Sequence, residues 1–126
     1  MDGPIARLTI NHPETRNPLG VPGDGARFRA AADAINANRE LRCVIMTGAG
    51  SAFSAGGDLK AMRDKTGNFG GSPAELRDHY RHSIHGIIHA LWDIEVPMIG
   101  AINGPAIGLG NDVASLCDIR IASSTA

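Results

Sequence analysis

Apolar and polar positions along the chain follow strand periods in some segments and helix periods in others. Residues 5–10 alternate, with Ala6, Leu8 and Ile10 on the apolar side, as in a half-buried strand. Residues 43–47 and 98–102 are short apolar runs of strand length, and the first is typical of a buried parallel strand. A further strand is predicted just before Ser123.

The segments between these strands carry helical spacing. One helix is predicted from Gly25 to about Asn38, and one helical turn from Leu59 to Arg63. Ser72 and Glu75 form a capping box that begins what we predict to be the longest helix, which should end before Pro97. Its apolar stripe consists of Leu76, Tyr80, Ile84, Ile87, Ile88 and Leu91. Another helix is predicted after Gly108 and Gly110, ending at Asp118.

Strands that alternate with helices indicate βαβ units and an α/β fold. The 126 residues fit one domain, and a hydrophobic fraction of 43% with a net charge of −1 is typical of a soluble globular protein. Lysines and arginines are scattered, so we expect no nucleic-acid partner. No apolar run approaches the ~20 residues of a membrane-spanning helix, so we expect a cytoplasmic protein without a membrane partner.

Histidine and cysteine positions do not indicate a metal site. His85 and His89 have the i, i+4 spacing of a helical site, but no glutamate of the HExxH type and no third ligand accompany them. We therefore predict an exposed histidine face and no metal. Cys43 and Cys117 lie in apolar runs without redox spacing, so we predict two buried free thiols.

Two glycine-rich loops carry the candidate chemistry. Each follows a predicted strand and leads into a helix, one over residues 48–58 and the other at Gly108 and Gly110. Free backbone N–H groups at a helix start can hold an anion or a developing oxyanion. Asp112 is close enough in sequence to act there as a general acid or base. The alternatives are a glycine turn, a flexible connection and an aspartate that only favours the helix N-terminus.

Three segments together resemble the enoyl-CoA hydratase/isomerase family, also called the crotonase superfamily. They are TINHPETRNPL (9–19), CVIMTGAGSAFSAGGDLKAM (43–62) and VPMIGAINGPAIGLGNDVASLCDIRIAS (96–123). The resemblance implies a crotonase-like spiral of ββα units with a mainly parallel sheet. It also implies that residues 1–126 form the N-terminal part of such a domain, without the C-terminal helical region that builds a trimer or hexamer.

The resemblance further implies how the site works. An acyl-CoA thioester would be polarised by the backbone N–H groups of Gly57 and Leu109, with Asp112 at the position of the first catalytic acid. Most relatives have glycine where Leu109 stands, so its side chain could narrow the acyl pocket, and hydratases carry glutamate where Asp112 stands. Coenzyme A is part of the substrate, and no other cofactor is implied. The residues matched to acyl-CoA binding are Arg16, Pro18, Ala55, Gly56, Asp58, Leu59 and Met62, with Asp58 ordering its loop by hydrogen bonds to nearby backbone N–H groups.

Three functions fit the sequence. The first is an enoyl-CoA hydratase that adds water to a 2-enoyl-CoA. The second is a dienoyl-CoA or enoyl-CoA isomerase, since the family has members with aspartate at the position of Asp112. The third is a non-catalytic fragment that binds CoA or a partner, whose uncovered sheet would expose apolar surface and lead to self-association.

Overall fold

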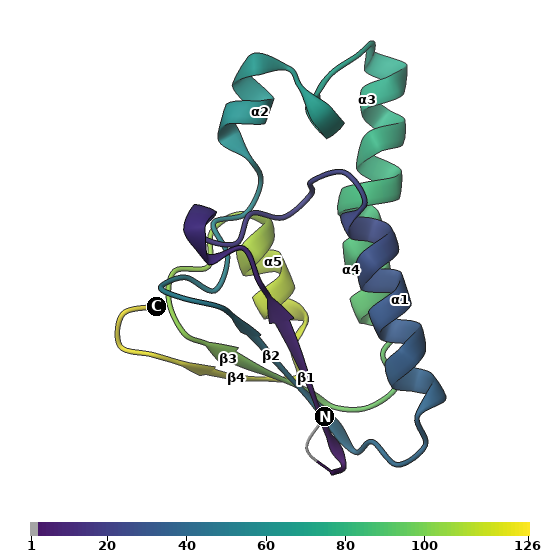
Figure 1. Cartoon of the computed structure of the whole chain (residues 1–126), viewed down its shortest axis with the longest axis vertical. Helices are drawn as coiled ribbons and strands as arrows, with labels where there is room; N and C mark the ends of the chain where they lie inside the picture. The colour runs from purple at the N-terminus through teal and green to yellow at the C-terminus, as the bar shows by residue number, and fades with distance from the viewer. Residues whose placement is uncertain (1–2) are drawn as a thin grey trace.

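The computed structural model describes residues 3–126; the remaining residues, Met1 and Asp2, lie outside the described part. Its centre is a four-stranded sheet built from β1 (Ile5–Ile10), β2 (Cys43–Gly48), β3 (Met98–Ile102) and β4 (Ile119–Ala122). The strands lie in chain order and every neighbouring pair is parallel (Figure 1). The predicted α/β fold with a mainly parallel sheet is confirmed.

Helical segments connect consecutive strands. Helix α1 (Asp24–Ala37) leads from β1 to β2, and α5 (Leu109–Leu116) from β3 to β4. The connection from β2 to β3 is longer and contains α2 (Leu59–Asp64), α3 (Pro73–His79) and α4 (His85–Trp92). Figure 1 shows α2 and α3 at the top of the molecule, on the side toward which β1 points. Short 3₁₀ turns lie at Pro13–Thr15 and Gly67–Phe69.

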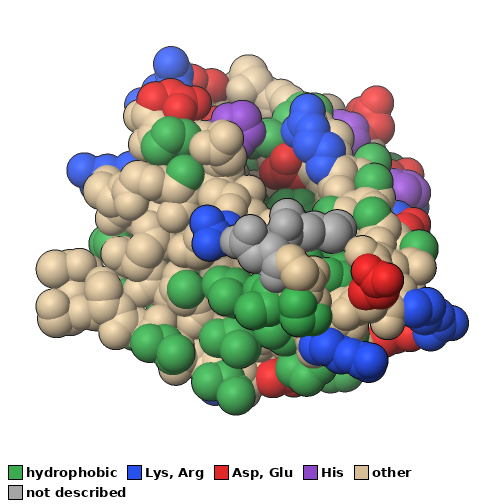
Figure 2. Space-filling model, turned by 60° about the horizontal axis from the view of Figure 1, so that its bottom comes forward, with side chains coloured by type: hydrophobic (Ala, Val, Ile, Leu, Met, Phe, Trp, Pro, Cys, Tyr) green, Lys and Arg blue, Asp and Glu red, His purple; other side chains and the backbone are tan. Residues whose placement is uncertain are grey.

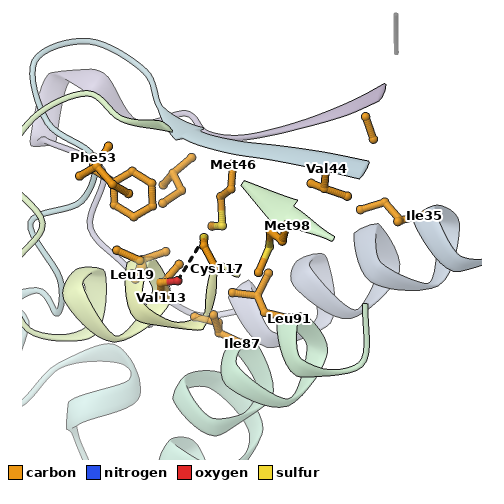
Figure 3. Packing of buried hydrophobic residues seen from close by; sticks show 14 of the residues in the cluster. Leu19, Ile35, Val44, Met46, Phe53, Ile87, Leu91, Met98, Val113 and Cys117 are labelled. Carbon is orange, nitrogen blue, oxygen red and sulfur yellow. Dashed lines mark hydrogen bonds between the residues drawn. The ribbon is translucent and has the colours of Figure 1, made fainter. Parts of the chain in front are cut away.

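The hydrophobic core fills the space between one face of the sheet and helices α1, α4 and α5 (Figure 3). Val44 and Met46 of β2 are fully buried, as are Ile87 of α4 and Val113 of α5. Because successive strand residues point to opposite faces, the inward positions alternate along each strand. This core fixes the sheet against the helices and thereby positions the loops that leave the strands.

The other face of the sheet carries apolar side chains, and no helix within residues 3–126 covers it. Ile45 pairs with Ile99, and Ile99 pairs with Ile119, so these side chains form a row across the sheet. Ile119 is 57% exposed and Ile121 of the same strand 67%. Figure 2 shows hydrophobic side chains gathered into one patch on the face where the sheet lies. Parallel sheets are normally covered on both faces, so this surface is unusual for its class.

The predicted long helix contains an interruption. Between α3 and α4, residues Tyr80–Ile84 form a π-helical turn, so the helical run is continuous but its hydrogen-bond pattern is not. Here α1 crosses closely, and a side chain on Gly25 would collide with the carbonyl oxygen of His82. We attribute the π-helical turn to this close crossing, because a single widened turn changes the course of a helix locally.

Cys43 is half-buried at the start of β2, so the prediction that both thiols are buried is wrong for Cys43. It is correct for Cys117, whose thiol donates to the carbonyl oxygen of Val113 at 3.7 Å. Burial raises the pKa of the Cys117 thiol. Among residues 3–126, no helix has the length and hydrophobicity needed to span a membrane.

Candidate functional site

The first glycine loop, residues 49–57, leaves the end of β2 and is held from two sides by asparagine side chains. Asn17 is fully buried, and its amide nitrogen donates to the carbonyl oxygens of Ala49 at 2.8 Å and Ala52 at 2.9 Å. Asn103 donates to the carbonyl oxygens of Gly50 at 3.0 Å and Ala52 at 3.3 Å. Both asparagines therefore hold the Ala52 carbonyl, and the loop has little freedom to move.

The second glycine loop, residues 103–110, leaves the end of β3 and runs beside the first. Ser54 pairs with Ala106, and its carbonyl oxygen accepts from the N–H of Ile107 at 3.0 Å. Gly110 packs directly on the same residue, since a Cβ at Gly110 would lie 2.6 Å from the Ser54 oxygen. The two loops are thus hydrogen-bonded together along their length.

The two loops also approach each other closely at Gly56. Its φ of +78° favours glycine, and a Cβ there would collide with the carbonyl oxygen of Ile107 and lie 3.3 Å from the amide nitrogen of Leu109. Gly56 also fixes the peptide that follows it, because its carbonyl oxygen accepts from the N–H of Leu19 at 2.8 Å. In a trans peptide the N–H points opposite to the carbonyl, so the N–H of Gly57 points away from Leu19.

Gly57 and Leu109 both offer free donors. Within residues 3–126 the N–H of neither residue has a hydrogen-bond acceptor in the protein. Leu109 is the first residue of α5, where N–H groups lack intrahelical partners and the helix dipole adds partial positive charge. The structure thus brings the two sequence-predicted donors into adjoining loops; their convergence on one oxygen stays a prediction.

The side chain of Leu109 is half-buried. The side chain packs against the hydrophobic core, and its Cδ2 atom lies 3.9 Å from the position of a Cβ on Gly20. Asp112, one turn further along α5, is exposed, and its N–H donates to the carbonyl oxygen of Gly108 at 3.1 Å. A catalytic role for Asp112 stays a prediction.

An open groove of about 560 Å³ lies beside the first loop. Four of the residues matched to acyl-CoA binding line it together with Gly57, namely Pro18, Ala55, Asp58 and Leu59. The other lining residues are His12, Thr15, Val21 and Lys60. Neither Leu109 nor Asp112 is among these lining residues. The groove therefore gathers the first loop and its neighbours, and no residue of the second loop is among its lining residues.

Three further residues matched to acyl-CoA binding lie outside this lining. Arg16 is exposed, in left-handed conformation with φ 61°, and its carbonyl oxygen accepts from the N–H of Ala55 at 2.8 Å. Gly56 lies between the two loops, as described above. Met62 lines a second cavity, next to α3. The structure thus separates Met62 from the groove.

Asp58 orders the end of the first loop. Its Oδ1 atom accepts from the N–H of Ala61 at 3.0 Å, which makes Asp58 the N-cap of α2. The prediction that Asp58 orders the loop through a backbone N–H is confirmed.

Sequence reasoning missed four residues of this region. Asn17, Ser54 and Asn103 hold the loops, and Lys60 is the one lysine in the lining of the groove. Asn17 stands before a proline and Asn103 before a glycine, which are ordinary turn signals. Those signals do not show which distant carbonyls the side chains bind. Among the described residues 3–126, no group of three His, Cys, Asp or Glu side chains is placed to hold a metal ion.

Comparisons with known proteins give the same family as the motifs. The family model described as enoyl-CoA hydratase/isomerase matches residues 1–126. The chain belongs to the enoyl-CoA hydratase/isomerase family. The Mycobacterium tuberculosis protein named probable enoyl-CoA hydratase EchA14 is 35% identical over 126 residues, a match that covers 100% of this chain and 46% of that protein.

Two other matches are a solved structure and a relative with a different named activity. The crystal structure of enoyl-CoA hydratase from Bacillus anthracis is similar with a TM-score of 0.83 and 30% identity, covering 98% of this chain and 45% of that one. The 4-chlorobenzoyl coenzyme A dehalogenase-1 of Arthrobacter is 33% identical over 95 residues, which are 73% of this chain and 32% of that protein. The chain spans about half the length of the curated relatives it matches.

Proposed function

We propose that this chain provides the thioester-binding part of an enoyl-CoA hydratase site. The observation that carries the proposal is the contact between the two glycine loops at Gly56, which places the free N–H of Leu109 next to the peptide that bears the N–H of Gly57. Two fixed backbone donors that point at one oxygen form an oxyanion hole. Family membership supports an acyl-CoA thioester as the source of that oxygen.

In the proposed reaction the thioester oxygen of a 2-enoyl-CoA accepts from Gly57 and Leu109. Water adds to the carbon β to the carbonyl, and negative charge develops on the thioester oxygen as an enolate. Donors held in place before the reaction stabilise this charge without reorganising, and each is typically worth about 3 kcal/mol. The asparagines Asn17 and Asn103 would keep the first donor fixed through the Ala52 carbonyl.

Asp112 is our candidate for moving a proton in this reaction. It lies in the first turn of α5, three residues after Leu109, so its carboxylate is within about one helical turn of the free N–H of Leu109. A carboxylate there could accept a proton from the attacking water, and the carboxylic acid so formed could give that proton to the carbon α to the carbonyl. The shorter aspartate side chain must still come within ~3 Å of the proton that it transfers.

Leu109 offers a sharp test because it occupies the first position of α5. Proline is tolerated at this position, and Leu109→Pro removes the N–H donor while leaving the helix start. Leu109→Ala removes the same side-chain packing but keeps the donor. We expect Leu109→Pro to lower kcat with a 2-enoyl-CoA about 10²-fold or more below Leu109→Ala, at similar helix content by circular dichroism. Equal rates in the two variants would remove this donor from the mechanism.

The product distinguishes the proposed activity from the alternatives. A hydratase product gains the mass of one water, whereas an isomerase product keeps the mass of the substrate. Mass spectrometry after incubation with a 2-enoyl-CoA and a 3-enoyl-CoA separates the two. Binding of acyl-CoA by calorimetry with no change of mass in either substrate would indicate a CoA-binding module instead.

A further inference from the structure

Ser54 lies in the first glycine loop, and none of its surface is exposed to solvent. Its hydroxyl group donates to the carbonyl oxygen of Asn17 at 2.7 Å and accepts from the N–H of Gly56 at 3.1 Å. The carbonyl oxygen can only accept and the N–H can only donate, so the one hydroxyl hydrogen must point at Asn17. The hydroxyl group is therefore fixed in orientation as well as in place.

The main chain of Ser54 is bound to the second glycine loop. Its N–H donates to the carbonyl oxygen of Pro105 at 3.1 Å, and its carbonyl oxygen accepts from the N–H of Ile107 at 3.0 Å. A serine of the first loop is thus held against the second loop by both of its main-chain groups. Its hydroxyl group consequently keeps a constant position relative to the second loop.

Ser54 also contacts the residue next to each proposed donor. Gly56 precedes Gly57, and the hydroxyl oxygen of Ser54 accepts from the Gly56 N–H. Gly110 follows Leu109, and a Cβ on Gly110 would lie 2.6 Å from the carbonyl oxygen of Ser54, 2.8 Å from its Cβ and 2.9 Å from its Oγ. The distance between the two donors is therefore set across Ser54.

Gly56 connects Ser54 to the first donor. The carbonyl group of Gly56 and the N–H of Gly57 belong to one planar peptide group, so a rotation of Gly56 turns the Gly57 donor. Glycine is the residue with the widest choice of backbone angles, which makes a restraint on its N–H important. Ser54 is not among the residues that line the groove, so its influence on a bound thioester passes through Gly56.

We propose that Ser54 is the positioning residue of the oxyanion site: it sets the distance and relative direction of the Gly57 and Leu109 donors, and it controls kcat more than substrate binding. The inference rests on the proposed function, because it takes these two amides as the donors. A misplacement of about 1 Å costs about 10²-fold in rate. Donors aimed at charge that develops during the reaction stabilise the transition state more than the bound substrate.

Ser54→Ala removes the hydroxyl group and keeps the main-chain bonds to Pro105 and Ile107. The Gly56 N–H then loses its acceptor, and Gly56 is free to rotate. We expect kcat with a 2-enoyl-CoA to fall about 10²-fold and KM to stay within about threefold. Ser83→Ala is the matched control and should change neither constant, because Ser83 is also buried, lies in the π-helical turn, and its hydroxyl has no hydrogen-bond partner within residues 3–126.

The carbonyl stretching frequency of a bound thioester reports on the donors without turnover. The probe is butanoyl-CoA with an isotopic label at its thioester carbonyl, because its saturated chain cannot take up water. A hydrogen bond to the carbonyl oxygen weakens the C=O bond, so the frequency falls in an infrared difference spectrum. At saturating probe the unmodified chain and Ser83→Ala should show the same fall, and Ser54→Ala should lose a large part of it. A serine that only stabilises the fold would lower the melting temperature and leave this frequency unchanged.

Ser54→Cys covers the case in which Ser54→Ala does not fold. Its side chain has a similar shape, but a thiol is a weak hydrogen-bond donor and acceptor, so kcat and the frequency change should be lost in the same way. Frequencies and rates that agree between the Ser54 variant and Ser83→Ala would overturn the inference and leave the proposed function intact. No fall in frequency with the unmodified chain, or thioester binding no tighter than that of free coenzyme A, would overturn both.

Discussion

Asn17→Ala is the most direct test of how the first glycine loop is held. The Asn17 side chain makes three hydrogen bonds: it accepts from the N–H of His12 at 2.8 Å and donates to the carbonyl oxygens of Ala49 at 2.8 Å and Ala52 at 2.9 Å. All of it is buried, with 0% exposed. Its backbone φ of 57° lies in the left-handed region, which asparagine tolerates better than alanine.

The expected loss in the free energy of unfolding of Asn17→Ala can be estimated from these contacts. Each lost hydrogen bond costs about 1 kcal/mol net, and a carbonyl left buried without a partner costs about 1–3 kcal/mol more. Ala49 loses the Asn17 amide, whereas Ala52 keeps the weaker bond from Asn103. Left-handed backbone in alanine adds about 1 kcal/mol. Because Ala52 keeps one partner and Ala49 is only half-buried, the full penalty for an unpaired carbonyl is not added. The three lost bonds and the backbone then sum to about 4 kcal/mol, so we expect a loss of about 3–5 kcal/mol in the free energy of unfolding, a large part of the stability of a typical domain.

Urea unfolding followed by far-ultraviolet circular dichroism measures this loss. Asn11→Ala is the matched control, because Asn11 is exposed and makes no side-chain hydrogen bond in the described part of the chain. It should change the free energy of unfolding by less than about 0.5 kcal/mol. A loss below about 1 kcal/mol in Asn17→Ala would refute the view that these bonds hold the loop. Acyl-CoA affinity should fall in Asn17→Ala and stay unchanged in Asn11→Ala.

Three further predictions use other parts of the structure. Gly56→Ala should lower the free energy of unfolding by at least about 2 kcal/mol, because the new Cβ would collide with the carbonyl oxygen of Ile107 and the φ of +78° is unfavourable for alanine. An unchanged midpoint of urea unfolding would contradict this prediction. Asp112→Asn should lower kcat about 10²-fold or more at unchanged melting temperature, whereas a purely structural aspartate would give the opposite result. The N–H of Ser72 lowers the pKa of Glu75, so this carboxylate stabilises the folded state above its ordinary pKa and loses that effect as the pH falls through the lowered value. Glu75→Gln should therefore flatten the acid side of a plot of melting temperature against pH, and identical plots for the two proteins would count against the cap.

Much of the fold was predictable because apolar residues recur at different spacings in strands and in helices. The runs at β2 and β3 and the capping box of α3 lie where the sequence predicts them. The π turn at Tyr80–Ile84 was not predictable, since its apolar stripe fits a regular helix equally well. It occurs where Gly25 of α1 presses on the carbonyl of His82, a contact between segments far apart in the chain.

The candidate site was predictable to a different extent. Glycine runs after strands indicate loops with free N–H groups, and both loops are present. The residues that hold these loops were not predictable, because Asn17 binds carbonyls that lie 32 and 35 residues away. A turn-forming asparagine has the same local pattern whether or not its side chain is buried. The place of Met62 between Gly57 and the second cavity also depends on how α2 packs on its neighbours.

The chain order of the four strands has a consequence for how the protein folds. Each strand pairs with its sequence neighbour, and the stretch of chain between paired strands is shortest for β3 and β4 and longest for β2 and β3. Closing a longer loop costs more entropy, so we expect β2 and β3 to join after the other pairs. The two glycine loops leave these same strands. The surface that would bind a thioester is therefore assembled in the last and most entropically costly closure of the sheet.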